Sequence, residues 1–177
     1  MIYMVDHIFS DAAMEPAWHE HYAGYLLKLL GVPGLTTAQR FKAVDASPPR
    51  FLAMYSVSSP AIYDSPEYKA MGGGGSQSAR FHGAYQMWTR NLCEGAEFAP
   101  EVKPDELVFT LDCDAPDEEL SGLFPGKLVW LHSVGLHITT QYRALVILDR
   151  ESAAKARSVG RGFIYAPFTA FLTSQKR

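Results

Sequence analysis

Apolar residues along the first 98 positions recur with the periods of strands and helices. Ile2–Phe9 consists mostly of apolar β-forming residues, which predicts a strand. Between Pro16 and Leu30 the apolar residues recur at helical spacing, and Gly31 ends the predicted helix. The remaining elements of this half are predicted as strands at 36–44 and 50–57, a short helix at 59–71, a helical stretch from Ser76, and a helix end followed by a strand at 87–98. The order is strand, helix, strand, strand, helix, strand.

The same order returns after the linker-like segment 99–104. A unit of this kind forms a four-stranded antiparallel sheet with both helices on one face, the ferredoxin-like arrangement. We therefore predict an α+β protein with two ferredoxin-like βαββαβ repeats, residues 1–98 and 105–174. Their uncovered sheet faces must bury each other, either sheet to sheet or as a barrel closed within one chain. The elements of the second repeat are predicted as strands at 107–113, 127–136, 141–148 and 163–171, with Pro167 indicating an edge or bulge, and helices at 116–124 and 151–159.

Composition narrows the class of protein. The chain has 177 residues, of which 47% are hydrophobic, so it can bury a core without disulfides or metal. The net charge of −3 and 16 scattered Lys and Arg residues argue against a nucleic-acid partner. No apolar run is long enough to span a membrane, and the first residues lack the basic region of a signal peptide. With only Cys93 and Cys113 present, we expect reduced thiols and a cytoplasmic location.

The first seventy or so residues resemble a known superfamily. The helix with Trp18-His19-Glu20-His21-Tyr22 runs into a Pro33-Gly34 turn, followed by the strands Ala38–Phe41 and Phe51–Tyr55. This arrangement resembles the dimeric α/β-barrel superfamily, and most nearly its EthD-like branch, here as a tandem duplication in one chain. The resemblance implies a small-molecule pocket inside the barrel. It also implies cofactor-free chemistry, as in most members, although other members are haem enzymes.

The first predicted strand carries a candidate general base. Strand alternation places Tyr3, Val5, His7 and Phe9 on one face. If this face lines the barrel lumen, His7 is buried among aromatic residues, and burial lowers its pKa and keeps the imidazole neutral at pH 7. The alternative is a histidine at a strand end that bonds to a backbone carbonyl.

Two further residues are candidates for stabilising negative charge. Arg40 stands in the middle of a strand, where a lumen-facing guanidinium binds a carboxylate or stabilises an enolate. Tyr55 can donate a hydrogen bond to a carbonyl oxygen. The alternatives are a surface arginine in a salt bridge and a core tyrosine whose hydroxyl lies at the rim.

Other rings and cations are candidates for substrate binding. They follow the glycine run 72–75, which is predicted as a flexible loop over the pocket, or lie near the first helix and strand. Core packing is the alternative for each. A helical metal site is not predicted, because residues two apart on a helix, such as His19 and His21, point about 200° apart. The candidate substrate-binding residues are Tyr3, His19, Tyr22, His82, Trp88 and Arg90.

The sequence leads to a hypothesis about function with several alternatives. We expect a cofactor-independent enzyme that acts by proton transfer, as a lyase, isomerase or dehydratase. Its substrate is a small aromatic or ring-bearing carbonyl or carboxylate compound, with His7 as base and Arg40 and Tyr55 stabilising charge. The alternatives are a cofactor-free monooxygenase of phenolic substrates, a non-catalytic small-ligand-binding barrel protein, and a haem protein. The sequence leaves open whether the chain forms a homodimer.

Overall fold

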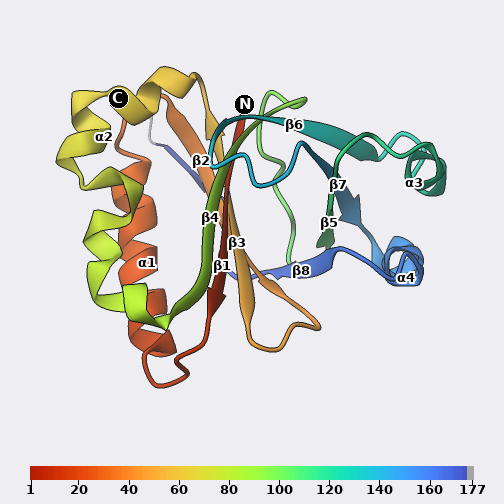
Figure 1. Cartoon of the computed structure of the whole chain (residues 1–177), viewed down its shortest axis with the longest axis horizontal. Helices are drawn as coiled ribbons and strands as arrows, with labels where there is room; N and C mark the ends of the chain where they lie inside the picture. Colours follow the sequence, from red (N-terminus) through yellow and green to blue (C-terminus); the bar gives the residue numbers. More distant parts are fainter. Residues whose placement is uncertain (175–177) are drawn as a thin grey trace.

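The computed structural model of the chain describes residues 1–174, apart from the side-chain surroundings of residues 74 and 150 (Figure 1). Strands and helices follow the predicted order in both halves. The elements of the first half are β1 (Ile2–Phe9), α1 (Glu15–Leu29), β2 (Leu35–Ala43), β3 (Arg50–Val57), α2 (Pro66–Ala70) and β4 (Tyr85–Glu94), with 3-10 helices at Pro60–Asp64 and Gly73–Ala84. Those of the second half are β5 (Leu107–Cys113), α3 (Glu118–Leu123), β6 (Leu128–Leu136), β7 (Tyr142–Leu148), α4 (Arg150–Ser158), β8 (Phe163–Pro167) and β9 (Leu172–Thr173).

The strands form a closed antiparallel barrel. The hydrogen-bonded order is β3-β1-β4-β6-β7-β5-β8-β2-β9, and β2 also pairs with β3, which closes the ring. Two pairs join the halves of the chain: β4 with β6, where Asn91 lies opposite Leu136, and β2 with β8, where Phe41 lies opposite Pro167. Closure leaves no long free edge in the barrel, which removes the usual template for aggregation.

The barrel separates three apolar clusters. One fills the lumen and includes Met4, Leu52 and Leu145. A second lies between the sheet of the first half and α1, which buries Trp18 against it. The third lies under α3 and α4, outside the strands of the second half. Figure 1 shows α1 and the helical segment after β3 on one side of the barrel, and α3 and α4 at the far side. The strands β1 and β3 are therefore buried on both of their faces, whereas β6 exposes His132 and Val134.

A network of charged residues crosses the lumen. Asp6 on β1 is 2% exposed and accepts hydrogen bonds from Arg143 Nη1 at 2.8 Å and from Arg50 Nη2 at 3.1 Å. Arg143 also forms a two-point ion pair with Asp112, and Arg50 Nε donates to the Tyr165 hydroxyl at 2.9 Å. The network ties strands β1 and β3 of the first half to β5, β7 and β8 of the second.

Two details of the sequence prediction are wrong. The segment 87–98 does not begin as the end of a helix, because β4 extends from Tyr85 to Glu94 and pairs with β1 along its length. The linker-like segment 99–104 joins β4 to β5 and is partly buried, because Ala99 and Val102 belong to the lumen cluster and Gln39 bonds both backbone groups of Val102. The last predicted strand, 163–171, ends at Pro167, which lacks the N–H that a continued ladder needs.

The helical stretch predicted from Ser76 is a 3-10 helix that begins earlier, at Gly73, and ends at Ala84. Within residues 1–174, no helix is long and apolar enough to cross a membrane.

Candidate active site

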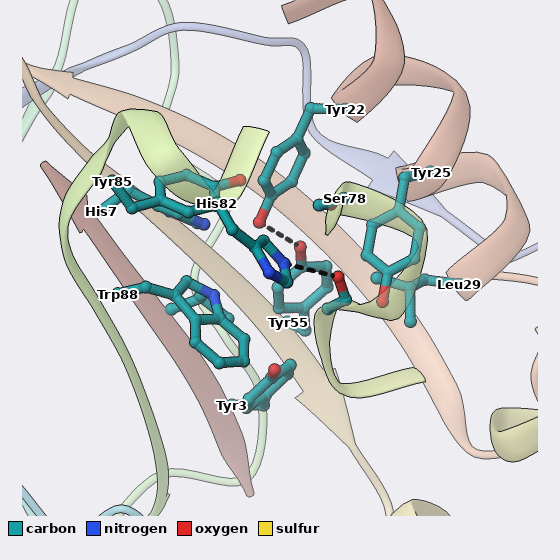
Figure 2. A pocket seen from close by; sticks show the side chains of 12 residues that line it. Tyr3, His7, Tyr22, Tyr25, Leu29, Tyr55, Ser78, His82, Tyr85 and Trp88 are labelled. Atoms are coloured by element: carbon teal, nitrogen blue, oxygen red, sulfur yellow. Dashed lines mark hydrogen bonds between the residues drawn. The ribbon is translucent and has the colours of Figure 1, made fainter. Parts of the chain in front are cut away.

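The predicted aromatic face of β1 does not line the lumen. Tyr3, Val5 and Phe9 pack in the cluster under α1, whereas Ile2 and Met4 fill the lumen. Between this face of the sheet and the helical layer lies a small pocket of about 30 Å³ that opens to solvent. Figure 2 shows its lining, which consists of Tyr3, Val5, His7, Tyr22, Tyr25, Leu29, Tyr55, Gly75, Ser78, His82, Tyr85 and Trp88.

His7 lines this pocket among rings. Its imidazole lies 5.4 Å from the ring centroids of Trp18, Tyr22 and Tyr85, and the residue is 2% exposed. Burial, and next the positive charge of Arg40, lower the pKa of His7 to about 3. None of the described residues forms a hydrogen bond with the ring of His7. His7 is therefore neutral at pH 7, and its nitrogen atoms are available to a ligand.

Arg40 lies behind the pocket wall as a buried cation. Its guanidinium carbon sits 3.9 Å from the ring centroid of Tyr22 and 4.7 Å from that of Trp18. No carboxylate of the described residues pairs with it. Its Nη2 donates to His19 Nδ1 at 3.3 Å, and His19 Nε2 donates to Glu15 at 3.1 Å, so Glu15 acts as an indirect counter-ion. Arg40 thus faces α1 and is neither lumen-facing nor on the surface.

Two tyrosine hydroxyls meet inside the pocket. The Tyr22 and Tyr55 hydroxyl oxygens share a hydrogen bond at 3.1 Å, and both side chains are buried (Figure 2). Burial raises the pKa of Tyr22 to about 12, although Arg40 opposes the shift, and burial also raises the pKa of Tyr55 well above its usual value. Both hydroxyls are therefore protonated at neutral pH, and a shared pair leaves one hydrogen available to a ligand.

The 3-10 helix Gly73–Ala84 closes the outer side of the pocket. His82 Nε2 lies 3.0 Å from the Gly75 carbonyl oxygen, and Ser78 Oγ lies 3.3 Å from His21 Nε2. Gly75 has φ +95°, and an added Cβ atom would lie 3.1 Å from the Trp88 ring. The glycine run is thus a packed cover on the pocket, in the place where a loop was predicted.

The structure brings most of the predicted residues together. Tyr3, His7, Tyr22, Tyr55, His82 and Trp88 all line the pocket. Arg40, His19 and Arg90 do not line it. His19 lies on the far side of Arg40, against Phe168 at 4.5 Å, so it is not at the pocket mouth.

Three polar lining residues, Tyr25, Ser78 and Tyr85, were not among the candidates predicted from the sequence. Tyr25 lies one helical turn after Tyr22, which was a usable signal. Tyr85 is the first residue of β4, three residues after His82. Its hydroxyl accepts a hydrogen bond from Trp18 Nε1 at 2.8 Å, which fixes one wall of the pocket.

The described residues contain no group of three or more histidine, cysteine or acidic side chains placed to hold a metal ion. Cys93 and Cys113 are free thiols outside the pocket.

Comparison with known proteins gives relatives in fold. No protein-family model matches the chain, and no curated protein matches it in sequence. An anthrone oxidase-like protein of known structure superposes with a TM-score of 0.66 and 15% identity, over 99% of this chain and 94% of that one. A protein of Fusobacterium nucleatum named as a candidate monooxygenase superposes with a TM-score of 0.55 and 11% identity, over 99% of this chain and 98% of that one. A second protein named as a candidate monooxygenase, from Lactobacillus acidophilus, superposes with a TM-score of 0.54 and 7% identity, over 98% of this chain and 96% of that one.

At these identities the likeness concerns the fold alone. It confirms an α+β fold of the dimeric α/β-barrel type, closed within one chain. The EthD-like branch and the tandem duplication stay predictions.

Proposed function

We propose that this protein is a cofactor-free monooxygenase that oxidises an electron-rich hydroxy-aromatic compound, of the phenol or anthrone type, with dioxygen. The observation that carries the proposal is the neutral, unbonded imidazole of His7 in an aromatic pocket beside a buried cation without a carboxylate partner. The names of the structural neighbours, anthrone oxidase-like and candidate monooxygenase, support this chemistry over the proton-transfer reactions of a lyase or isomerase.

In the proposed reaction, His7 accepts the proton that activates the substrate. Loss of this proton gives a carbanion whose negative charge is shared with the substrate oxygen. The hydroxyl pair of Tyr22 and Tyr55 donates a hydrogen bond to that oxygen, and the charge of Arg40 stabilises it through a region of low dielectric. The developing negative charge also raises the basicity of His7, because a nearby opposite charge favours the imidazolium.

Dioxygen supplies the oxidising power. The carbanion reduces O₂ and forms the C–O bond of a hydroperoxide. Cleavage of the remaining C–H bond and of the O–O bond then gives a ketone and water. One oxygen atom enters the product and one leaves as water, and the substrate itself supplies all the electrons. The aromatic wall keeps water away from the carbanion, which strengthens the electrostatic contribution of Arg40.

Oxygen uptake on 1,8-dihydroxyanthrone tests the proposal. We expect uptake above the protein-free rate, one O₂ consumed per quinone formed, and one atom of ¹⁸O from ¹⁸O₂ in the product. His7→Phe keeps an aromatic ring and removes the base, so the rate should fall by about 100- to 10,000-fold. His132→Phe is the matched control, because His132 is exposed on β6 and stacks on Tyr142 outside the pocket.

Two results would contradict the proposal. The first is a His7→Phe variant that keeps the wild-type rate with an unchanged melting temperature. The second is product formation without oxygen, which would favour the lyase or isomerase hypothesis.

We also infer that residues 1–98 and 105–174 are two ferredoxin-like repeats. Strand order supports this: in each half the first strand lies between the third and the fourth, and the second strand pairs with the third. The helical layers of the two halves differ: the aromatic pocket lies under the helical layer of the first half.

A further inference from the structure

Arg90 places a second positive charge next to the pocket. It lies on β4 opposite Val5, two residues after Trp88, and its guanidinium carbon is 4.7 Å from the Trp88 ring centroid. Val5 and Trp88 both line the pocket. The charge of Arg90 also reaches Tyr3: it opposes the effect of burial, which raises the pKa of that lining residue. Arg90 is therefore placed to act on a group at the edge of a bound ligand.

The guanidinium of Arg90 lacks an acidic partner. Four other arginines pair with aspartates, namely Arg50, Arg143, Arg157 and Arg161. Among the described residues, none of the ion pairs includes Arg90, and its Nε is buried without a hydrogen bond. A guanidinium has five N–H donors, and the only side-chain acceptor that the described part of the chain offers this one is His137, whose Nε2 lies 3.3 Å from Nη2.

His137 does not supply enough acceptors. Its Nδ1 faces the backbone N–H of Arg90 at 3.3 Å, and its Nε2 faces the guanidinium. A neutral imidazole carries one N–H, so only one of its two nitrogens can accept a hydrogen bond. Burial, and next the charge of Arg90, lower the pKa of His137 and keep it neutral. Both contacts lie at exposed positions, so the Nη N–H groups of the guanidinium that His137 does not accept face solvent, where an incoming oxyanion can accept their hydrogen bonds.

The backbone holds His137 in this place. Its neighbours Leu136 and Ile138 have φ of +67° and +46°, a left-handed conformation that is unfavourable for residues with such side chains. The side chain of Asn91 fixes the segment: its Nδ2 donates to Thr139 Oγ1 at 2.8 Å, and its Oδ1 accepts from the Thr139 N–H at 2.9 Å. Strain kept by such contacts is characteristic of functional sites.

We propose that Arg90 and His137 bind a carboxylate of the aromatic substrate at the edge of the pocket. The proposal rests on the proposed function for the aromatic part of the ligand and adds its chemical class, a planar hydroxy-aromatic acid. The ring enters between Tyr3 and Trp88, and the acid group stays at the partly exposed rim that β4 and the end of β6 form. Both halves of the chain then contribute to substrate binding.

A pair of probes with the same ring tests the charge requirement. The dissociation constants of 2-naphthoate and 2-naphthamide are measured by titration calorimetry. We expect wild-type protein to bind the acid about tenfold or more tightly than the amide, since a hydrogen bond to a charged group is stronger than one to a neutral group. In Arg90→Gln this preference should disappear, while the affinity for the amide stays the same.

Two further variants complete the test. Arg80→Gln is the matched control, because Arg80 is an exposed arginine over a phenylalanine ring outside the lining; it should keep the preference. His137→Gln should reduce the preference without removing the charge, which provides a second readout if Arg90→Gln folds poorly. Equal binding of both probes to the wild type, or a preference that survives in Arg90→Gln, overturns the anion site and leaves the aromatic pocket intact. If neither probe binds, the anion site and the aromatic pocket are both overturned.

Discussion

Replacing Asp6 by Asn should destabilise the protein more than its small change in size indicates. The side chain lies in the lumen, where both of its oxygens accept hydrogen bonds from arginines. In Asp6→Asn the amide oxygen can accept from one arginine, but the amide nitrogen then faces the donors of the other. The variant leaves Arg143, whose side chain is 3% exposed, short of one negative partner.

The size of the effect follows from this burial. Breaking a buried ion pair by removal of one partner costs about 3–5 kcal/mol. Asp112 contacts the same arginine, but its side chain is 45% exposed, so water replaces part of what Asp112→Asn removes. For this control we expect about 1 kcal/mol or less. In a protein of this length these losses correspond to drops in melting temperature of about 6–20 °C and about 2–4 °C.

The effect should also depend on pH in a known direction. Although burial raises the pKa of Asp6, Arg143 and Arg50 outweigh it and hold the pKa below its usual value. The unfolded chain then binds the proton first, so the stabilisation is complete above the unfolded pKa of about 3.9 and is lost as the pH falls through the folded pKa. The difference between wild type and Asp6→Asn should be constant from about pH 5 to 8 and shrink below about pH 4.

Urea unfolding followed by circular dichroism at several pH values measures these differences, and equal m-values validate the comparison. A loss no larger than that of Asp112→Asn, or a difference that persists unchanged in acid, would refute the reasoning about the buried network.

Two further predictions concern the pocket. Arg40→Met removes a charge that lowers the pKa of His7, so the His7 pKa measured by NMR titration should rise above about 3; an unchanged value would contradict the assigned influence of Arg40. Gly75→Ala should destabilise the protein by about 1 kcal/mol or more, because the residue has φ +95° and its Cβ would press on Trp88. Gly83→Ala is the control and should change stability little, because an added Cβ at Gly83 has no atom within 4 Å. Thermal unfolding compares the two variants, and equal effects would show that the segment covering the pocket does not pack tightly.

Hydrophobic periodicity was sufficient to predict the order of elements, because turns such as Pro33-Gly34 mark their ends. Hydrophobic periodicity placed the start of β4 too late, since no proline separates the 3-10 helix from the strand that follows. The segment 99–104 has a feature that its sequence does not reveal. Its prolines and charges are typical of a linker, but Ala99 and Val102 fill the lumen, a tertiary fact that local composition does not record.

The sequence predicted many residues of the candidate site but not on which side of the barrel wall the site lies. Alternation correctly put Tyr3 and His7 on one face, but both faces of β1 are buried, so the pattern could not tell lumen from helical layer. The position of His137 could not be predicted, because it depends on left-handed backbone at Leu136 and Ile138. Leucine and isoleucine rarely adopt this conformation, so the sequence does not indicate it.

Closure of the barrel within one chain also has a consequence for the order of synthesis. The strand β2 emerges from the ribosome well before its partner β8, which lies in the second half of the chain. Until then the sheet of the first half has unpaired edges at β2 and β4, and the apolar side chains of Ile2 and Met4 face solvent. Exposed edges of this kind promote association between nascent chains. The helical layer can cover one face of this early sheet, but only the completed second half protects the other.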